Sequence, residues 1–249
     1  MINFFRRIRQ QLLSENKFSK YLLYAIGEIV LVVIGILIAL QINNWNEDHK
    51  LAIKTQNYYQ QLLEDLNKDR IFITQTLSKF DLQRKAYQNY LDKFKTSQFT
   101  LTSIYEDLLH LNTESYALYF NTSTIESLQN SGEIVLIPPL LRNKLLDLKR
   151  MQQKITRDES LDNRAKTGVT ERLSMFMGTS NFWERIENQE DLKPVMTMEK
   201  SDTEIILGME AVQGWMDFSE KKSIQQLKEL LQEIEKVEEL IHKEINPHD

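Results

Sequence analysis

The sequence predicts an all-α protein: one N-terminal transmembrane helix that continues into a long-helix bundle, a coiled-coil-like domain outside the cytoplasm. Three observations lead to this fold class. A twenty-residue apolar run lies near the N-terminus, apolar residues then recur every seven positions, and only 7 Gly and 4 Pro occur among 249 residues. Sandwiches, barrels and nucleotide-binding sheets need many special turns, so the scarcity of Gly and Pro disfavours them.

The apolar run extends from Tyr21 to Leu40. Twenty helical residues cover roughly 30 Å, which is the thickness of the hydrocarbon core of a bilayer. Tyr24 near its start and Trp45 beyond its end suit the two membrane interfaces. No pair of small residues marks a cleavage site at its exit, so we expect an uncleaved signal anchor.

The charges on either side of the run predict its orientation. The positive residues before it are Arg6, Arg7, Arg9, Lys17 and Lys20, and those shortly after it are Lys50 and Lys54. Positive residues stay in the cytoplasm. We therefore expect a basic cytoplasmic segment at 1–20, a transmembrane helix at 21–42 and an exported helical domain at 43–249. The stretch 2–9 is either an amphipathic piece that binds membrane lipid or only a topology signal.

One face of the transmembrane helix is a candidate contact surface. Its residues recur at helical spacing: Ala25, Glu28, Val32, Gly35 and Ala39. Gly35 and Ala39 form a small-xxx-small pair, which lets a second helix approach closely. Two interpretations of Glu28 remain open: it hydrogen-bonds to a partner helix, or it extends to the cytoplasmic headgroups near Lys20. The partner would be a second copy of the chain or another membrane protein.

Two stretches resemble a known family. The first is the run from Tyr24 to Glu47, which reads YAIGEIVLVVIGILIALQINNWNE, and the second joins Ser123–Gly132 to Leu140–Leu145. The chain is similar along essentially its whole length to the domain-of-unknown-function family DUF6090, bacterial single-span membrane proteins seen mainly in Bacteroidetes-type bacteria. The resemblance implies anchoring in the bacterial inner membrane, and with the orientation expected from the charges the main domain would lie in the periplasm. It implies no activity.

Two long helices are expected in the exported domain. The first carries a seam of residues seven apart: Trp45, Ala52, Tyr59, Leu66, Ile73, Phe80, Tyr87 and Phe94. The second extends from Asp202 to Ile245 behind a capping box at 201–204, and Gly208 and Gly214 are places where it could bend or split. We expect the two helices to pair antiparallel, because each has an apolar stripe to bury. The competing arrangement is a parallel homodimer through the first seam, interrupted by Arg70 and Arg84.

The region between these helices is more broken. We expect a helix at Thr102–His110, a short one that begins with a Ser123–Glu126 capping box and stops at Gly132, and an extended piece at Glu133–Ile137. Two further helices are expected, from Pro139 to Lys154 and from Asp158 to Met177. No repeat or low-complexity linker divides this part, so it is predicted to be one domain.

The chain shows no recognisable catalytic or metal-binding motif. It has no Cys, its four His have no partner at ligand spacing, and no phosphate loop or nucleophile elbow occurs. We therefore expect no cofactor and no catalytic residue. The net charge of −5 argues against a nucleic-acid partner. A weak candidate for a ligand loop is the segment with Tyr116, Tyr119 and Ser123, because free amides at a helix start attract anions; in the competing interpretation Ser123 only caps and the aromatics are core.

Three functional classes remain open from the sequence. The first and favoured one is a membrane-tethered interaction or scaffold protein without enzymatic activity. The second is an extracytoplasmic sensory bundle, which would need a partner for signalling because only about twenty residues lie on the cytoplasmic side. The third is an enzyme whose site leaves no motif.

Overall fold

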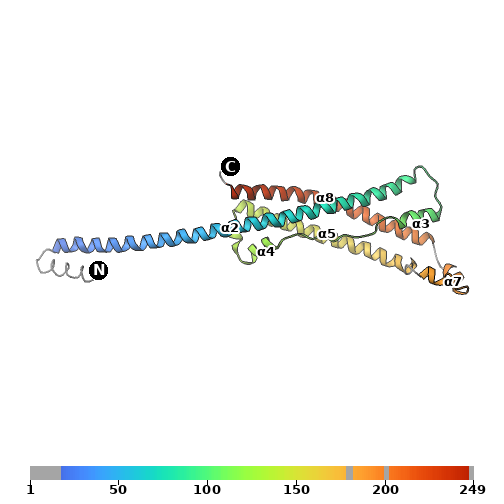
Figure 1. Cartoon of the computed structure of the whole chain (residues 1–249), viewed down its shortest axis with the longest axis horizontal. Coiled ribbons are helices and arrows are strands. Elements are labelled where there is room, and N and C mark those ends of the chain that lie inside the picture. Colours follow the sequence, from blue (N-terminus) through green and yellow to red (C-terminus); the bar gives the residue numbers. More distant parts are fainter. Residues whose placement is uncertain (1–17, 178–181, 199–201, 247–249) are drawn as a thin grey trace. The chain divides into compact units, whose positions relative to one another are not determined.

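The computed structural model describes residues 18–177, 182–198 and 202–246, which are mostly helical and contain no strand. The elements are α2 (Phe18–Lys93), α3 (Leu101–Leu109), α4 (Ser123–Asn130), the 3-10 turn η1 (Glu133–Leu136), α5 (Pro139–Met177), α6 (Phe182–Ile186), α7 (Leu192–Met198) and α8 (Asp202–Ile245). The predicted all-α class is confirmed (Figure 1). The basic stretch 2–9 and Ser201 of the predicted capping box lie outside the described residues.

The chain divides into two compact units, Met1–Asn57 and Tyr58–Asp249. The described part of the first unit is helical and belongs to α2. Its apolar side chains are exposed from Leu22 to Trp45, and an 18-residue window has a mean hydropathy of 2.6 with no residue buried. Among the described residues, α2 is the one helix long and apolar enough to cross a membrane.

The second unit is a bundle of three long helices. The part of α2 from Tyr58 onward, α5 and α8 lie side by side in Figure 1. Contacts between α2 and α8 pair early residues with late ones: Arg70 with Glu238, and Tyr90 with Glu210. The antiparallel pairing of these two helices is therefore present within one chain. The seam from Tyr59 to Phe80 is buried inside the bundle, so it is not open to a homodimer.

Helix α5 is antiparallel to α8 and thus parallel to α2. Lys144 near its start pairs with Glu233, and Leu173 near its end packs against Gly208. A Cβ on Gly208 would lie 2.8 Å from Leu173 Cδ1, so the absence of a side chain lets the two helices approach closely there. Helix α8 is continuous through both glycines, and Gly208 acts as a packing position rather than a break.

Two apolar cores are stacked along the bundle. The first core is built around residues with 0–4% exposure, and it includes Leu62, Ile73, Leu145, Leu230 and Ile234. The second core lies toward the other end of the helices and consists of Tyr90, Leu108, Leu173, Ile205, Ile206, Met209, Val212 and Met216. Helix α3 contributes Leu108 to the second core, and its own start is closed by a Thr100–Ser103 capping box.

Two local predictions were wrong. The piece after Gly132 is the 3-10 turn η1 rather than an extended segment: Gly132 takes a φ of 75°, and the chain becomes extended only at Ile137, the residue before a proline. The region from Pro139 onward is one helix of 39 residues instead of two. No Gly or Pro separates the expected pair, and the intervening Ile155 is buried at 1% exposure, so core packing continues through the junction.

Candidate functional site: a groove beside α5 and a buried polar layer

A non-helical stretch at 111–122, the return segment, connects α3 to α4 and runs along α2 in the opposite direction. Gln83 bonds to Glu114 O at 3.3 Å, and further toward the start of α2 Asn121 bonds to Asp69. The ring of Phe72 lies 4.6 Å from that of Tyr119 and 6.2 Å from that of Phe120. The segment therefore covers the side of the bundle between α2 and α5.

Among the described residues the return segment pairs with no strand, and its backbone carbonyl oxygens instead accept hydrogen bonds from amide side chains of the helices. Besides Gln83, Asn163 donates to Tyr116 O at 3.2 Å and Gln213 donates to Asn112 O at 3.3 Å. Extended backbone near a bundle surface must find hydrogen bonds outside a sheet ladder, and here three helices supply them. The position of this segment consequently depends on α2, α5 and α8 together.

The end of the return segment is held by a buried carboxylate. Asp69 has 0% exposure and accepts hydrogen bonds from Asn121 N at 2.8 Å, Asn121 Nδ2 at 2.7 Å and Gln152 Nε2 at 2.7 Å. Burial raises the pKa of the Asp69 carboxyl, and the bonds from Asn121 and Gln152 oppose that rise. Asp69 thus joins α2, the return segment and α5 at one point.

The start of α4 is occupied by a second carboxylate from α2. Asp65 Oδ2 accepts from Thr124 Oγ1 at 2.7 Å, from Ser123 Oγ at 3.2 Å and from Thr124 N at 3.3 Å. The predicted capping box is wrong, because the N-cap is Thr122, which makes no side-chain cap bond, and Ser123 is already helical. The anion that a helix start attracts is the chain's own Asp65, so Ser123 is not open to an external one.

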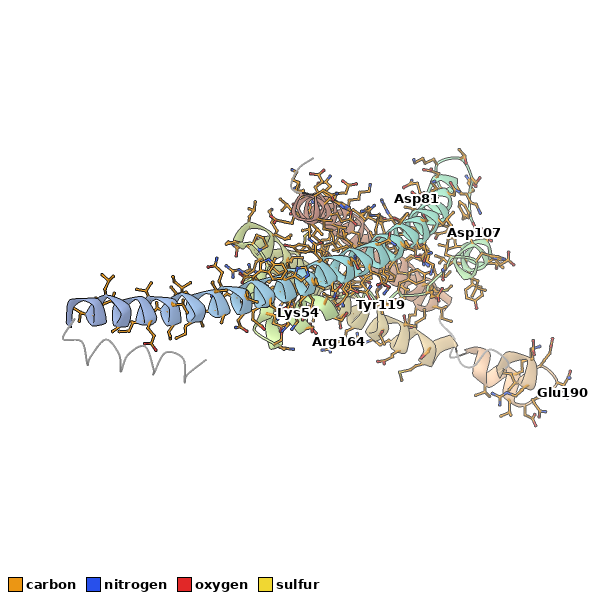
Figure 2. The ribbon with its side chains drawn as sticks, turned by 60° about the vertical axis from the view of Figure 1, so that its left-hand side comes forward. Lys54, Asp81, Asp107, Tyr119, Arg164 and Glu190 are labelled. Carbon is orange, nitrogen blue, oxygen red and sulfur yellow. The ribbon has the colours of Figure 1, made fainter. Side chains whose placement is uncertain are left out.

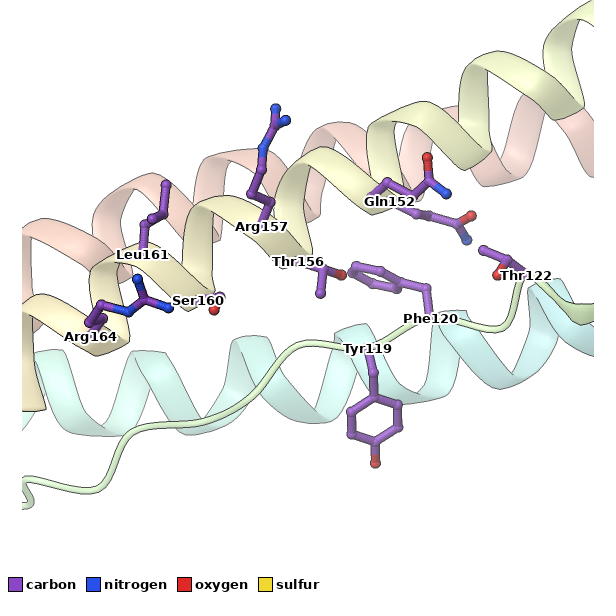
Figure 3. Close-up of a pocket in the computed structure, with 10 residues that line it drawn as sticks. Tyr119, Phe120, Thr122, Gln152, Thr156, Arg157, Ser160, Leu161 and Arg164 are labelled. Carbon is purple, nitrogen blue, oxygen red and sulfur yellow. The ribbon is translucent and has the colours of Figure 1, made fainter.

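A groove lies between the return segment and α5, with a volume of about 580 Å³ (Figure 3). It is lined by Tyr119, Phe120, Thr122, Gln152, Gln153, Thr156, Arg157, Ser160, Leu161 and Arg164. Four of the lining residues on α5, Gln152, Thr156, Ser160 and Arg164, recur every fourth position, so that one helical face meets the segment. Figure 2 shows Tyr119 and Arg164 on the bundle.

Only one of the three predicted loop residues lines this groove. Tyr119 does, with its ring turned away from α5 in Figure 3. Tyr116 instead packs with Phe80, has Lys79 Nζ 4.9 Å above its ring and donates to Glu114. The groove residues of α5 could not be singled out from the sequence, because an alternation of Gln, Thr, Ser and Arg on a helix is typical of a solvated face.

A buried polar layer separates the two apolar cores. Glu159 and Lys166 of α5 are 3% and 4% exposed and form an ion pair at 3.7 Å, and Ser223 of α8 donates to Glu159 at 2.6 Å. At the same position along the bundle, Lys222 of α8 forms an ion pair with Asp162 of α5 at 2.6 Å. Such a layer costs desolvation energy, which the ion pairs and hydrogen bonds offset.

Glu220 is the exception within this layer. It is 4% exposed, and among the described residues no hydrogen bond or ion pair reaches its carboxyl group. Burial is the main cause that raises the pKa of Glu220 to about 7; the charges of Lys166 and Arg84 lower it, and those of Asp217 and Glu159 raise it. Arg84 is drawn mainly to Asp217, at 3.6 Å. Glu220 is therefore a group that changes charge near neutral pH inside the bundle.

The predicted transmembrane contact face lies within the first unit. Ala25 and Glu28 are partly exposed, Val32 is 55% exposed, and a Cβ on Gly35 would meet nothing within 4 Å. With Ala39 these residues keep one face of the helix, as their spacing requires. No group of three or more His, Cys, Asp or Glu residues suited to a metal ion occurs within the described part of the chain.

These features define a class: an all-α protein in which an exposed apolar helix precedes a three-helix bundle with an outer groove. The profile of the family of unknown function DUF6090 matches residues 28–181, which is more than half of the chain. The chain belongs to this family. No solved structure matches it.

One curated relative is an enzyme. The chain is 29% identical over 136 residues to the UDP-N-acetylmuramoylalanine–D-glutamate ligase of Borreliella burgdorferi, a match that covers 49% of this chain. The match spans only 28% of the ligase, so it concerns a minor part of that protein. It assigns no activity to the groove or the polar layer.

Proposed function

We propose that this protein is a membrane-anchored interaction protein without enzymatic activity, held at the bacterial inner membrane by α2 with its bundle in the periplasm. The observation that carries the proposal is the contrast between the two units. The apolar residues from Leu22 to Trp45 are exposed, whereas the bundle from Tyr58 onward has closed cores of its own. Exposed apolar area of this extent is unfavourable in water at roughly 25 cal/mol per Å², and a bilayer removes that cost.

The orientation follows from the five positive residues before the apolar run and the two after it. Alkaline phosphatase fused after Asp249 is expected to be active, because that enzyme matures outside the cytoplasm. A fusion that stays inactive, together with an active cytoplasmic reporter at the same position, would reverse the orientation.

The interaction is assigned to the face with Gly35 and Ala39, where a small-xxx-small pair admits a neighbouring helix. Gly35→Leu fills that groove and is expected to weaken self-association or partner capture by the full-length chain in native membranes. Val30→Leu is the control: it places the same side chain in the same apolar run, but on the opposite side of the helix from Gly35. Equal capture by wild type and both variants would contradict the assignment.

A second candidate function is an extracytoplasmic sensor that signals through a partner. The groove beside α5 favours it, since a hollow with two arginines is a feature that an anchor or scaffold does not need. Ligand binding to the groove, measured on the full chain, distinguishes the two candidates.

A further inference from the structure

A second hollow, the α3 pocket, lies where α3 and the start of the return segment meet α5 and α8. Its volume is about 190 Å³. Its base consists of side chains of the second core that are only 1–9% exposed: Leu108, Leu173, Met209 and Val212. The second core therefore leaves a space beside it that its own side chains do not fill.

The rim of the α3 pocket is reachable from solvent. Thr113 of the return segment and Thr170 of α5 are exposed and line the pocket, as does Leu109 of α3, which is 50% exposed. Met209 at the base has an unbranched, flexible side chain that adapts to irregular spaces. A small molecule can consequently enter the pocket without unfolding of the bundle.

The α3 pocket offers no ionic partner to a ligand. Among the described residues that line it, none is charged. Two of its polar side chains already have partners in the protein. Gln213 Nε2 donates to Asn112 O at 3.3 Å, and Thr170 Oγ1 donates to the carbonyl oxygen one turn earlier in α5, at 3.0 Å. A charged ligand would lose its hydration in this pocket without compensation, so the pocket favours a neutral one.

The volume and the lining specify the size and the chemistry of such a ligand. An apolar cavity of about 150 Å³ lined by Leu, Ile and Phe side chains stays dry and binds benzene. The α3 pocket is somewhat larger and is lined mainly by Leu, Val and Met side chains. The sulfur of Met209 favours an aromatic ligand, because a thioether makes favourable contacts with the edge of a ring. A single aromatic ring with a small substituent therefore fits this pocket.

We infer that the α3 pocket binds a small neutral aromatic molecule of about the size of toluene. The ring contacts the apolar side chains of Leu108, Leu173 and Val212, and it completes the second core from the side of the rim. This inference goes beyond the interaction role assigned to α2, and it does not depend on the groove beside α5.

The test uses the full chain in lipid nanodiscs, with methionine labelled by ¹³C at its methyl group and toluene as the probe. A bound aromatic ring shifts the methyl signal of Met209, which is assigned by its loss in Met209→Leu. We expect this shift to reach saturation as toluene is added. Met151 packs against the first core and does not line the pocket, so its methyl signal should stay in place and thereby serve as an internal control.

A matched pair of variants tests whether the pocket itself is occupied. Thr170 and Thr167 are both exposed threonines of α5 whose hydroxyls donate to the backbone one turn earlier, but only Thr170 lines the pocket. Thr170→Phe places a ring of the chain's own at the pocket and should abolish the toluene-dependent shift of Met209. Thr167→Phe adds the same ring outside the pocket and should keep the shift.

A charged probe tests the requirement for neutrality on the unaltered protein. Benzoate has the same ring as toluene with a carboxylate in place of the methyl group, so it should not shift the Met209 signal at equal concentration. This comparison stays decisive if Thr170→Phe fails to fold, which a displaced Met151 signal would reveal.

Three results would overturn the inference. The first is a Met209 signal that toluene leaves unmoved or moves without saturation, as partition into lipid would. The second is an equal shift in folded Thr170→Phe and Thr167→Phe, and the third is an equal response to benzoate and toluene. Gly35→Leu alters only the first unit and should leave toluene binding unchanged, so the outcome is independent of the capture experiment.

Discussion

The two apolar cores of the bundle are built from the same long helices, but their side chains are buried to different degrees. The first core contains Leu230, Ile234 and Val237 at 0% exposure, and its members outside α8 come from α2, α4, α5 and the segments beside them. The second core relies on Met209 at 8% and Leu173 at 9%, and on the short helix α3. Loosely packed regions with flexible Met side chains open at lower free energy than tight ones. We infer that the first core determines global stability and that the second opens locally.

The largest expected effect comes from truncating matched leucines in the two cores. Leu230→Ala leaves a cavity in a fully buried site and is expected to lower the free energy of unfolding by about 3–5 kcal/mol. Leu173→Ala should cost closer to 2 kcal/mol, because its site is partly exposed and the neighbouring Met side chains can refill it. Denaturant unfolding of the full chain measures both, and hydrogen exchange should show faster opening near Leu173. A larger loss for Leu173→Ala would contradict the ranking.

The next effect concerns the polar layer between the cores. The pKa of Glu220 is about 7 in the fold and near 4.5 in an unfolded chain, so the folded state binds a proton more tightly. Stability from this group is therefore full below pH 4.5 and is lost as pH rises toward and through 7, by about 3 kcal/mol at most.

Replacing Glu220 with Gln tests this sign. Glu220→Gln should be more stable than wild type at pH 8, and the difference should vanish at pH 4. Glu239→Gln, an exposed carboxylate of the same helix, is the control and should show no such pH dependence. Melting temperatures across this range decide the matter, and a constant difference between Glu220→Gln and wild type would rule out the titration.

The smallest effect compares the two glycines of α8. A Cβ on Gly214 would meet nothing within 4 Å, so Gly214→Ala should stabilise by about 0.5–1 kcal/mol through helix propensity. At Gly208 the new methyl must displace Leu173 Cδ1, which cancels that gain or reverses it. In the Leu173→Ala background the penalty should disappear, and a double-mutant cycle would reveal this coupling. Independent, additive effects would show that Gly208 is not a packing position.

Much of the fold could be predicted because it is recorded in local patterns. The seven-residue seam from Tyr59 to Phe80 gave the buried face of α2, and Pro139 marked the first turn of α5. The prediction for the start of α4 failed because a tertiary contact decides the structure there. Ser123 looked like a cap, but Asp65, a residue of α2, fills that role from another helix.

The candidate site was even less accessible from sequence. Burial in the bundle raises the pKa of Glu220 to about 7, and charges from α2, α5 and α8 lower or raise it further. No spacing within one helix records that these elements meet around Glu220. The groove likewise joins the return segment to a face of α5 that reads as ordinary solvated helix. Tyr119 was singled out because it lies near Ser123, where free amides of a helix start were expected to attract an anion.

The central place of α8 has a consequence for how the chain is made. Residues of α8 complete both cores, yet they follow α2 and α5 in the sequence. As the ribosome elongates the chain, the apolar stripes of the two earlier helices emerge first. They cannot be fully buried until α8, with Ile241 near its end, has been synthesised. Contacts between residues as distant in sequence as Arg70 and Glu238 also form slowly, because the chain loses the entropy of closing a long loop before such contacts stabilise it. The nascent chain must therefore be shielded from aggregation throughout that interval, and a ribosome that stalls between α5 and α8 would release a product unable to fold.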